Sequence, residues 1–568
     1  MSSRRFQTLL FILPFLVLGA IAPSASAAAP VASIAADLNP GPSASNPSQL
    51  VVAGNRLFMR AQDAHGEELW SFDGTTGSRV SEIGPADDDA QIEDIVAVGD
   101  QVFFTAYDEA HGDELWRSDG STSTLVQDLN PGATGSNPGD LTVLGNYVYF
   151  RANNGSIGEE LWRADPSGIT LVKDIQPGAP TSSPSDLTAI GGLIYFNAYD
   201  AVAGDELFKT DGTTTTLVTN INPGNNNSYA RGFTALGGFV YFQAQTNADG
   251  VELWRTDGVT TTLVSDINPG VNGSYPSYMK SNGSAIYFSA NDGTHGTEVW
   301  RTDGGPATLV SDIQPGPEPS YPDDYTVLDG KVFFSAGNNT YGTELWVADG
   351  ATASLVYDLS PGQSAGGGYP KVAFNGSLYF YGYQQKTGAE LWTPGPSGVP
   401  QMVKDIQPGS SSSQLSDFTQ MGDSLYFRAD DGTHGAELWR LGPKPPDNTV
   451  TIKIEGKKAA VGKKGVTAIK LTCPADEASG PCNVKLSVTT SKPVNFKGKK
   501  KKVLISKKTI PVAAGVTGTA RLTIKKSVMD LLRSSGAARK VTVVAKVSDK
   551  AGNKKTVKKA YKLGRPAK

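Results

Sequence analysis

Short runs of alternating apolar and polar residues, separated by turn-forming pairs, fill most of the first 440 positions. In residues 262–304 this alternation predicts strands at 262–267, 277–280, 285–290 and 298–302. Turn pairs such as Pro269-Gly270 and Asn282-Gly283 punctuate them. The stretch carries no helical period. We therefore expect a four-stranded antiparallel unit with tight connections.

The unit is repeated along the chain, and each copy is marked by Glu-Leu-Trp or a close variant. The aromatic residue recurs every 46 residues, with one final step of 47, and all eight tryptophans of the chain belong to the series. Its members are Trp70, Trp116, Trp162, Phe208, Trp254, Trp300, Trp346, Trp392 and Trp439. A fixed period of this length indicates a repeat architecture.

Nine antiparallel units in series would leave unpaired strand edges unless they are arranged around an axis, as in a propeller. The predicted fold is all-β, with a large β-propeller of nine four-stranded, 46-residue repeats over residues 31–442. A β-solenoid is the main alternative, although its repeats are usually shorter and its strands parallel. Because no linker interrupts the rhythm, one ring is favoured over two smaller ones.

The motif in residues 262–304 and its copies resembles the ELWxxDGT repeat family of exported bacterial proteins. More loosely, a Trp that closes one strand before an Asp turn looks like the third-to-fourth strand hairpin of WD-repeat blades. If that analogy holds, residues 31–38 form the outer strand of the last blade, whose other strands come from residues 417–441. The N-terminal strand would then close the ring. The resemblance implies a fold and a secreted setting, and it carries no assigned chemistry.

A glutamate stands two residues before the aromatic in every copy. Its nine members are Glu68, Glu114, Glu160, Glu206, Glu252, Glu298, Glu344, Glu390 and Glu437. Alternation places this glutamate on the same face as the packed aromatic, so its carboxylate needs partners. We expect backbone N–H groups of an adjoining turn, or the basic residue that follows the aromatic, as at Arg117, Arg255 and Arg440. The alternative is a calcium ion in each blade, held with residues such as Asp266 or Asp292.

No catalytic, cofactor-binding or metal-binding residue is assigned from the sequence. A Gly-rich phosphate loop, a nucleophile elbow and a metalloprotease helix are all missing from it. The four histidines, His65, His111, His295 and His434, share one repeat position in a turn, which favours a structural role. Paired carboxylates for glycoside hydrolysis stay open because Asp and Glu are abundant. No cofactor is expected, with calcium as the alternative.

The N-terminus has the pattern of a signal peptide over residues 1–27. Arg4 and Arg5 precede an apolar stretch, and small residues lead up to Ala27. The apolar stretch is too short to span a bilayer comfortably, and no later segment approaches the necessary length. We therefore expect cleavage near Ala27 and a mature protein without a transmembrane segment, either secreted or associated with the cell surface. In that setting Cys473 and Cys482 should form a disulfide.

The net charge of −5 conceals a division of the chain into an acidic and a basic part. Residues 448–568 contain 30 Lys and Arg against five Asp and Glu, which leaves 21 against 51 in residues 1–447. A Pro-rich linker is predicted at residues 443–449, followed by a basic β-sandwich at 450–568. The segment around Cys473 and Cys482, with residues 549–553, resembles immunoglobulin-like C-terminal modules of exported actinobacterial proteins.

The basic domain carries its densest charge at Lys497 and residues 499–502, where it should attract polyanions. Stacking aromatics are scarce there, so specific nucleic-acid binding is not expected. The leading hypothesis is an exported, non-enzymatic propeller that binds an unknown glycan or protein ligand through its loops. Its basic domain would hold it at the cell envelope on an anionic polymer. The alternatives are a propeller-type hydrolase or lyase of extracellular polysaccharide, and a structural surface or matrix component.

Overall fold

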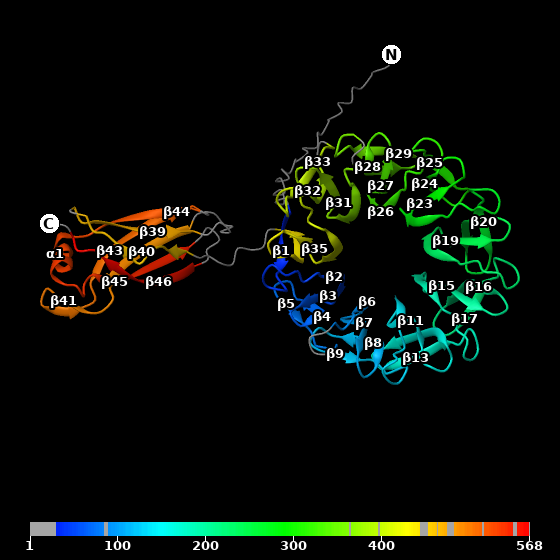
Figure 1. Ribbon diagram of the computed structural model, residues 1–568, viewed down its shortest axis with the longest axis horizontal. Coiled ribbons are helices and arrows are strands. Elements are labelled where there is room, and N and C mark those ends of the chain that lie inside the picture. The colour runs from blue at the N-terminus through cyan, green and yellow to red at the C-terminus, as the bar shows by residue number, and fades with distance from the viewer. Residues whose placement is uncertain are drawn as a thin grey trace, which may run out of the picture. The chain divides into compact units, whose positions relative to one another are not determined.

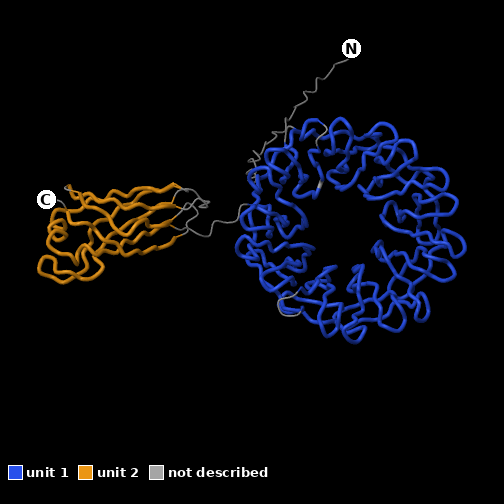
Figure 2. Tube along the Cα trace, viewed as in Figure 1, with its two compact units in different colours: residues 1–443 blue, residues 444–568 orange. Residues whose placement is uncertain are grey.

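The chain forms two compact units, residues 1–443 and 444–568 (Figure 2). The computed structural model describes residues 30–84, 89–362, 365–395, 398–443, 452–462, 464–473, 482–513, 516–548 and 554–566. The predicted signal peptide, residues 1–27, lies outside the described residues, as do residues 444–449 of the predicted linker.

The first unit is a closed ring of blades around a central channel (Figure 1). Its described residues form nine four-stranded sheets. In each sheet the strands follow one another antiparallel, and the first strand of each blade contacts the first strand of the next. The ring closes because the first strands of blades one and nine also touch. The predicted nine-bladed propeller is therefore confirmed, and the solenoid alternative is wrong.

The strands are named here from the channel outward, blade by blade. Blades one to three are β2 (Ser48–Ala53), β3 (Arg56–Asp63), β4 (Gly66–Phe72), β5 (Gly77–Arg79); β6 (Glu93–Val98), β7 (Gln101–Asp108), β8 (Gly112–Ser118), β9 (Ser123–Leu125); and β10 (Gly139–Leu144), β11 (Tyr147–Asn153), β12 (Glu159–Asp165), β13 (Gly168–Lys173). Blades four to six are β14 (Ser185–Ile190), β15 (Leu193–Asp200), β16 (Gly204–Thr210), β17 (Thr215–Thr219); β18 (Arg231–Leu236), β19 (Phe239–Thr246), β20 (Gly250–Thr256), β21 (Thr261–Ser265); and β22 (Ser277–Ser281), β23 (Ile286–Asn291), β24 (Thr297–Thr302), β25 (Thr308–Ser311). Blades seven to nine are β26 (Asp323–Leu328), β27 (Lys331–Asn338), β28 (Gly342–Asp349), β29 (Thr352–Tyr357); β30 (Tyr369–Phe374), β31 (Ser377–Gln384), β32 (Gly388–Pro394), β33 (Pro400–Lys404); and β34 (Ser416–Met421), β35 (Ser424–Asp430), β36 (Ala436–Gly442), β1 (Val31–Ala36).

Blade nine is completed by the N-terminal strand β1. This strand pairs antiparallel with β36, with Val31 opposite Gly442 and Ile34 opposite Trp439. Immediately after it, the Leu38 backbone N–H donates to Glu437 Oε2 at 2.7 Å. The predicted outer strand at residues 31–38 is therefore confirmed, and it joins the two ends of the ring without a covalent bond.

The core of the ring lies between neighbouring blades. Tyr241 and Leu253 of blade five pack against Phe288 and Trp300 of blade six, and the same cluster recurs at the other interfaces. Because side chains alternate along a strand, the Leu of Glu-Leu-Trp points to one neighbouring blade and the Trp to the other. Each motif therefore supplies an apolar side chain to both of its interfaces.

The second unit is a β-sandwich with its own apolar core (Figure 1). Its sheets are β37 (Lys453–Ile454), β39 (Val466–Thr472), β44 (Thr517–Thr523), and β38 (Lys458–Ala459), β46 (Lys554–Leu563), β45 (Lys540–Ser548), β40 (Cys482–Thr490), β43 (Leu504–Val512), with a separate hairpin β41 (Val494–Phe496), β42 (Lys499–Lys501). One helix, α1 (Lys526–Ser534), lies among its described residues. The predicted sandwich and the predicted disulfide Cys473–Cys482 are both found, and the disulfide joins the end of β39 to the start of β40. The immunoglobulin-like resemblance stays a prediction.

No helix in the described part of either unit is long and apolar enough to cross a membrane.

Candidate functional site

The repeated glutamate fastens each blade to the segment that leads into the next one. In blade five, Glu252 accepts hydrogen bonds from the backbone N–H groups of Ile267 and Asn268, at 2.8 and 3.1 Å. It also accepts one from Ser274 Oγ at 2.6 Å. Ile267 to Ser274 connects β21 to β22, so the carboxylate of one blade fixes the chain as it enters the next.

Backbone N–H groups of the connecting segment bond the corresponding glutamate in every blade. The nine glutamates, all with 0% of their surface exposed, are Glu68, Glu114, Glu160, Glu206, Glu252, Glu298, Glu344, Glu390 and Glu437. Each of these nine carboxylates accepts at least one hydrogen bond from a backbone N–H of its connecting segment. The first of the two predicted kinds of partner is therefore confirmed.

The second predicted partner, the basic residue after the aromatic, bonds elsewhere. Arg163 Nη1 donates to the Gly212 carbonyl at 2.8 Å, and Arg255 Nη1 donates to the Gly304 carbonyl at 2.7 Å. Each acceptor lies in the Asp-Gly turn of the following blade. The prediction that this basic residue pairs with the glutamate is wrong for these copies, because its long side chain reaches across the blade interface instead.

A buried serine, absent from the sequence predictions, lies beside the glutamate, and in six blades its hydroxyl donates to the carboxylate. It occupies one connector position in seven of the nine units: Ser45, Ser136, Ser182, Ser228, Ser274, Ser320 and Ser413, each at most 2% exposed. The exceptions are Ala90 and Gly366. The sequence alone could have revealed this serine, since a comparison of the nine copies shows the same residue about 22 positions after the glutamate in most of them.

Burial shifts the acidity of these glutamates. It raises the pKa of Glu68, Glu298, Glu344 and Glu390 to about 7, against the opposing effect of the hydrogen bonds that each carboxylate accepts. The pKa values of the other five are raised by the same cause. Their lone pairs face N–H and O–H donors, which is an unfavourable environment for a cation. The set therefore supports ring assembly better than calcium binding.

The imidazole rings of His111, His295 and His434 each bond to an aspartate of their own turn. Nδ1 of His111, His295 and His434 lies 2.7–2.9 Å from Asp108, Asp292 and Asp431, respectively. The hydrogen bond to the aspartate raises the pKa of each of these histidines. These contacts are local to the turn that precedes the Glu strand, which agrees with the structural role expected for His65, His111, His295 and His434. For His65, the backbone N–H donates to Asp63 Oδ1 at 2.9 Å.

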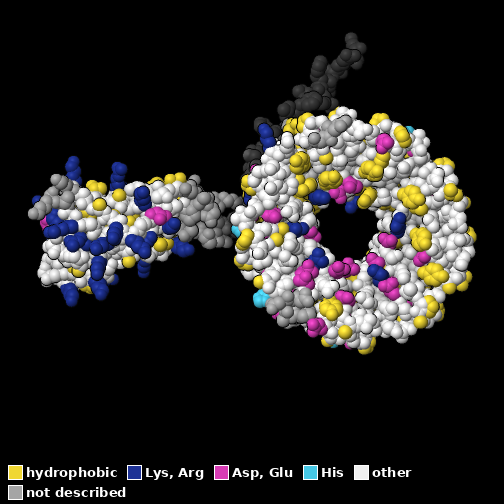
Figure 3. Space-filling view, in the orientation of Figure 1, with side chains coloured by type: hydrophobic (Ala, Val, Ile, Leu, Met, Phe, Trp, Pro, Cys, Tyr) yellow, Lys and Arg dark blue, Asp and Glu magenta, His cyan; other side chains and the backbone are white. Residues whose placement is uncertain are grey.

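The channel is lined by the first strands of the blades, and its rim carries acidic and basic side chains (Figure 3). Several of these side chains bond from blade to blade. Asp417 Oδ1 accepts the Gln49 N–H at 2.8 Å, Gln49 Oε1 accepts the Ile95 N–H at 3.1 Å, and Asp94 Oδ2 accepts the Asp140 N–H at 3.1 Å. These bonds link the innermost strands of neighbouring blades.

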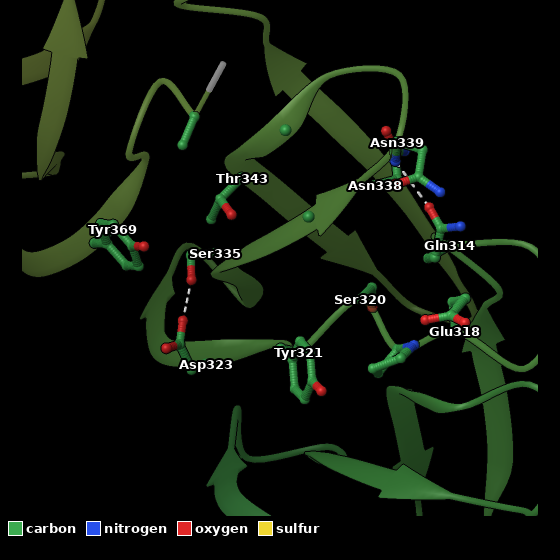
Figure 4. Close-up of a pocket in the computed structure, with 14 residues that line it drawn as sticks. Gln314, Glu318, Ser320, Tyr321, Asp323, Ser335, Asn338, Asn339, Thr343 and Tyr369 are labelled. Atoms are coloured by element: carbon green, nitrogen blue, oxygen red, sulfur yellow. Dashed lines mark hydrogen bonds between the residues drawn. The ribbon is translucent and has the colours of Figure 1, made fainter. Parts of the chain in front are cut away.

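An open hollow of about 680 Å³ lies between blades seven and eight, beside the segments that lead into each of them. Tyr321, Tyr369, Asp323, Asn339 and Thr343 are among its lining residues (Figure 4). Ser335 and Asp323 hydrogen-bond to each other there. The hollow combines two aromatic rings with amide, hydroxyl and carboxylate groups, and its volume is in the range of small-molecule sites.

Residues 87–94, between blades one and two, contain five acidic side chains, of which Asp87 and Asp88 lie outside the described residues. Asp89 Oδ1 accepts the Glu67 N–H at 2.7 Å, which gives this residue a role in its own loop. Within the described residues, no three His, Cys, Asp or Glu side chains are grouped so that they could hold a metal ion.

The second unit presents a lysine-rich face on its five-stranded sheet. Pairing among β40, β43, β45 and β46 places seven exposed lysines on the outer side: Lys485, Lys507, Lys540, Lys546, Lys554, Lys558 and Lys562. We call this set the lysine face. Lys485 lies directly opposite Lys546, and Lys540 lies directly opposite Lys562. Like charges in opposed positions destabilise a sheet, so an anionic partner would relieve this repulsion.

The predicted basic loop at Lys497 and residues 499–502 forms the hairpin of β41 and β42. The Nζ atoms of Lys497 and Lys501 lie 6.0 and 5.8 Å from the Phe496 ring centroid. The second unit thus has two lysine-rich surfaces, this hairpin and the lysine face. That face was not predicted from the sequence, because its residues come from four strands and meet only through their pairing.

A family model matches part of the ring. The model described as outer membrane protein assembly factor BamB matches residues 24–216, which cover blades one to three and most of blade four. It indicates a propeller-type repeat. No curated protein matches the chain.

Solved structures similar to this chain are distant from it. A puromycin-hydrolyzing peptidase of Mycobacterium tuberculosis is 12% identical, with a TM-score of 0.34, and the match covers 77% of this chain and 61% of the peptidase. Sqt1 of Saccharomyces cerevisiae is 8% identical, with a TM-score of 0.33 and coverages of 70% and 95%. A Xanthomonas campestris gluconolactonase is 13% identical, with a TM-score of 0.22 and coverages of 46% and 95%. The chain thus spans about three-fifths of the length of the peptidase that it matches.

Proposed function

We propose that the protein is an exported, non-enzymatic binding or adhesion protein. Its propeller presents a ligand-binding surface, and its basic unit holds it at the cell envelope on an anionic polymer. The lysine face carries this proposal. It gathers seven lysines on one side of one sheet, with two pairs in directly opposed positions.

The outward positions of that sheet carry no carboxylate among the described residues, so the lysines are not neutralised within their own face. Such a surface attracts a linear polyanion over a broad area, and the attraction weakens as salt screens it. Anionic wall or surface polymers offer the repeating charge that a flat array of lysines would match. Compact anions would engage only a few of the seven.

In the ring, the repeated ionisable groups serve assembly. The nine glutamates are buried and bonded to connector N–H groups, and three histidines bond to turn aspartates. A general acid or base must reach its substrate, which a fully buried carboxylate cannot do. The burial of these groups supports a scaffold whose loops carry the binding residues.

The test compares the full-length wild type with a variant that carries Lys485→Gln, Lys546→Gln and Lys558→Gln. Both are added to cells at low ionic strength, and bound and free protein are measured. We expect the variant to lose most of its retention. Wild-type protein should be released at about 0.5 M salt, where the Debye length is roughly 4 Å.

The matched control is Lys453→Gln, Lys470→Gln and Arg521→Gln, which removes the same charge from exposed positions of the other sheet. It should be retained nearly as well as wild type. Equal retention of all three proteins would contradict the proposal. Release of reducing sugar from envelope polysaccharide would instead favour the hydrolase alternative, and ligand-free self-assembly would favour the structural one.

A further inference from the structure

Three consecutive blades break the repeat symmetry in the same way. At the residue after the buried serine, blades five, six and seven carry Tyr229, Tyr275 and Tyr321. The equivalent residues in the other blades are Asn46, Gln91, Asn137, Ser183, Gly367 and Gln414. We call the three tyrosines the tyrosine arc, because equivalent positions in successive blades follow one another around the ring.

The side chains of the tyrosine arc are open to solvent. Tyr229, Tyr275 and Tyr321 are 49%, 58% and 71% exposed. A side chain that served the core would be buried, as the aromatic residues between the blades are. We therefore expect these exposed aromatic rings, repeated at one position, to contact a binding partner at the surface.

The backbone at these positions disfavours tyrosine. The φ angles of Tyr229, Tyr275 and Tyr321 are 46°, 52° and 47°, in the left-handed region, which bulky residues rarely adopt. The connector imposes this conformation, since the position has a positive φ in every blade. Asn and Gly tolerate it best, and they occupy the site in blades one, three and eight. Residues kept in an unfavourable conformation cluster at functional sites.

The hollow between blades seven and eight adjoins the arc. Tyr321 lines it together with Tyr369, and Asn339, Thr343 and Glu318 supply polar groups (Figure 4). Its carboxyl-bearing residues are Glu318 and Asp323, while the lining contains no Lys, Arg or His. A second exposed tyrosine of blade six, Tyr278, is 64% exposed and also has a positive φ, of 55°.

This combination of groups fits a sugar polymer. Tyrosine offers a flat apolar face that can cover the C–H side of a pyranose ring, and amide, hydroxyl and carboxylate groups can bond its hydroxyls. A peptide's apolar side chains would find little to enter, because the apolar lining beyond the tyrosines is Pro319 and Ala365. The acids would repel uronic or phosphorylated sugars.

We propose that the tyrosine arc and the adjoining hollow bind a neutral polysaccharide chain, with one aromatic platform on each of blades five to seven. This proposal rests on the proposed binding function and specifies its ligand class. A repeating ligand suits a repeating surface, because successive rings can engage successive parts of one chain. Affinity should therefore increase with oligosaccharide length.

The test measures binding of the full-length protein to neutral hexasaccharides of α- and β-linked glucose, β-linked mannose, galactose and xylose, by titration calorimetry. Hexagalacturonate is the acidic comparison. At least one neutral hexasaccharide should bind more tightly than its trisaccharide and more tightly than hexagalacturonate. The variant Tyr229→Asn, Tyr275→Asn, Tyr321→Asn should bind it at least tenfold more weakly, since roughly tenfold follows from the loss of about one well-placed ring contact.

The chain itself supplies the controls. Asparagine is the residue that blades one and three use at this site, so the triple variant should melt at the same temperature as wild type or higher. Tyr321→Phe keeps the ring and should retain most of the affinity. Tyr357→Asn removes an exposed tyrosine from β29 and should change nothing.

The proposal is overturned if no neutral hexasaccharide binds with a Kd below about 1 mM, or if the triple variant binds as well as wild type. In both cases retention through the lysine face could still be intact, so the proposed function would survive. If the protein binds a neutral hexasaccharide but is not retained on the envelope, the envelope anchoring is contradicted and the glycan site of the tyrosine arc stands. Binding of an extended peptide that the triple variant loses would assign the arc to a protein ligand instead.

Discussion

Ser182 Oγ lies 2.7 Å from Glu160 Oε2, and neither side chain is exposed to solvent. Glu160 belongs to β12 of blade three, whereas Ser182 lies in the segment that leads into blade four. The same carboxylate also accepts the backbone N–H groups of Ile175 and Ser182. One buried side chain thus fixes both ends of the connector between two blades.

Ser182→Ala should lower the stability of the ring by about 1–2 kcal/mol, because it removes one donor from a buried carboxylate that keeps its other partners. In a unit of this size we expect a fall in melting temperature of roughly 1–3 °C, measured by calorimetry. Ser167→Ala, which removes an exposed hydroxyl that donates to Asp165 Oδ1 in a turn, is the control and should change the melting temperature much less. Equal effects of the two variants would contradict a special role for the buried pair.

The raised pKa values of the glutamates predict how ring stability changes with pH. Glu298 has a pKa of about 7 in the folded protein and an ordinary value near 4.5 when unfolded. Between these values the folded state binds more protons, so this glutamate's contribution to stability is greatest below about 4.5 and is lost as the pH rises to about 7. When Glu298 is protonated, the Ser320 hydroxyl can accept a hydrogen bond from it and donate its own to the Thr297 carbonyl, 3.4 Å away.

Glu298→Gln mimics the protonated side chain and does not titrate. Its melting temperature, relative to that of wild type, should therefore rise as the pH increases from 4.5 to 8. Glu109→Gln, an exposed substitution, is the control and should show no such trend. A wild type that gains stability relative to Glu298→Gln across this range would show that the buried carboxylate is favoured in its charged form.

Metal removal tests the calcium alternative for the same glutamates. Because Glu252 and its equivalents already accept N–H and O–H donors, a chelator should leave the melting temperature of the ring unchanged. Calorimetric scans with and without excess EDTA, and after re-addition of calcium, measure this. A fall with EDTA that calcium reverses would contradict the assignment of these carboxylates to connector bonds.

The architecture of the ring could be predicted from the sequence because every blade repeats the same sequence pattern. Turn pairs such as Asn282-Gly283 set the ends of the strands, and the spacing of residues such as Trp254 and Trp300 set the number of blades. The closing strand was predicted from an analogy with other blades, and the pairing of Val31 with Gly442 confirms it. Local patterns suffice for these features, since each blade is built mainly from consecutive residues.

The surfaces could not be predicted in the same way. Lys485 and Lys546 are 61 residues apart in the chain and become neighbours only through strand pairing. Tyr229, Tyr275 and Tyr321 are visible in the sequence, but their solvent exposure and positive φ depend on how the connector is held. Because the neighbouring blade imposes this backbone conformation, the residues next to the tyrosines in the sequence do not predict it.

Reduction of the disulfide should destabilise the second unit alone. Cys473–Cys482 closes a short loop, and in the chain-entropy view its loss costs roughly 2–3 kcal/mol. The apolar core that contains both cysteines consists only of residues from this unit. Calorimetric scans with and without reductant should shift one transition and leave the transition of the ring in place. Cys473→Ser with Cys482→Ser should behave like the reduced protein, and a shift of both transitions would contradict independent cores.

Closure of the ring depends on the small strand β1. Ala32 is 2% exposed and packs in one core cluster with Trp439 and Leu441 of blade nine. Ala32→Asp would bury a carboxylate that has no hydrogen-bond or ion-pair partner. It should detach the strand, since burying an unpaired charge costs several kcal/mol. We expect a lower melting temperature and faster proteolysis near residue 30. Val31→Asp is the matched control, because Val31 is 45% exposed and its side chain can stay in water. If both variants melt like wild type, the strand does not close the ring in solution, and the other bonds between blades one and nine, such as Gln49 N–H to Asp417 Oδ1, must be sufficient to hold it.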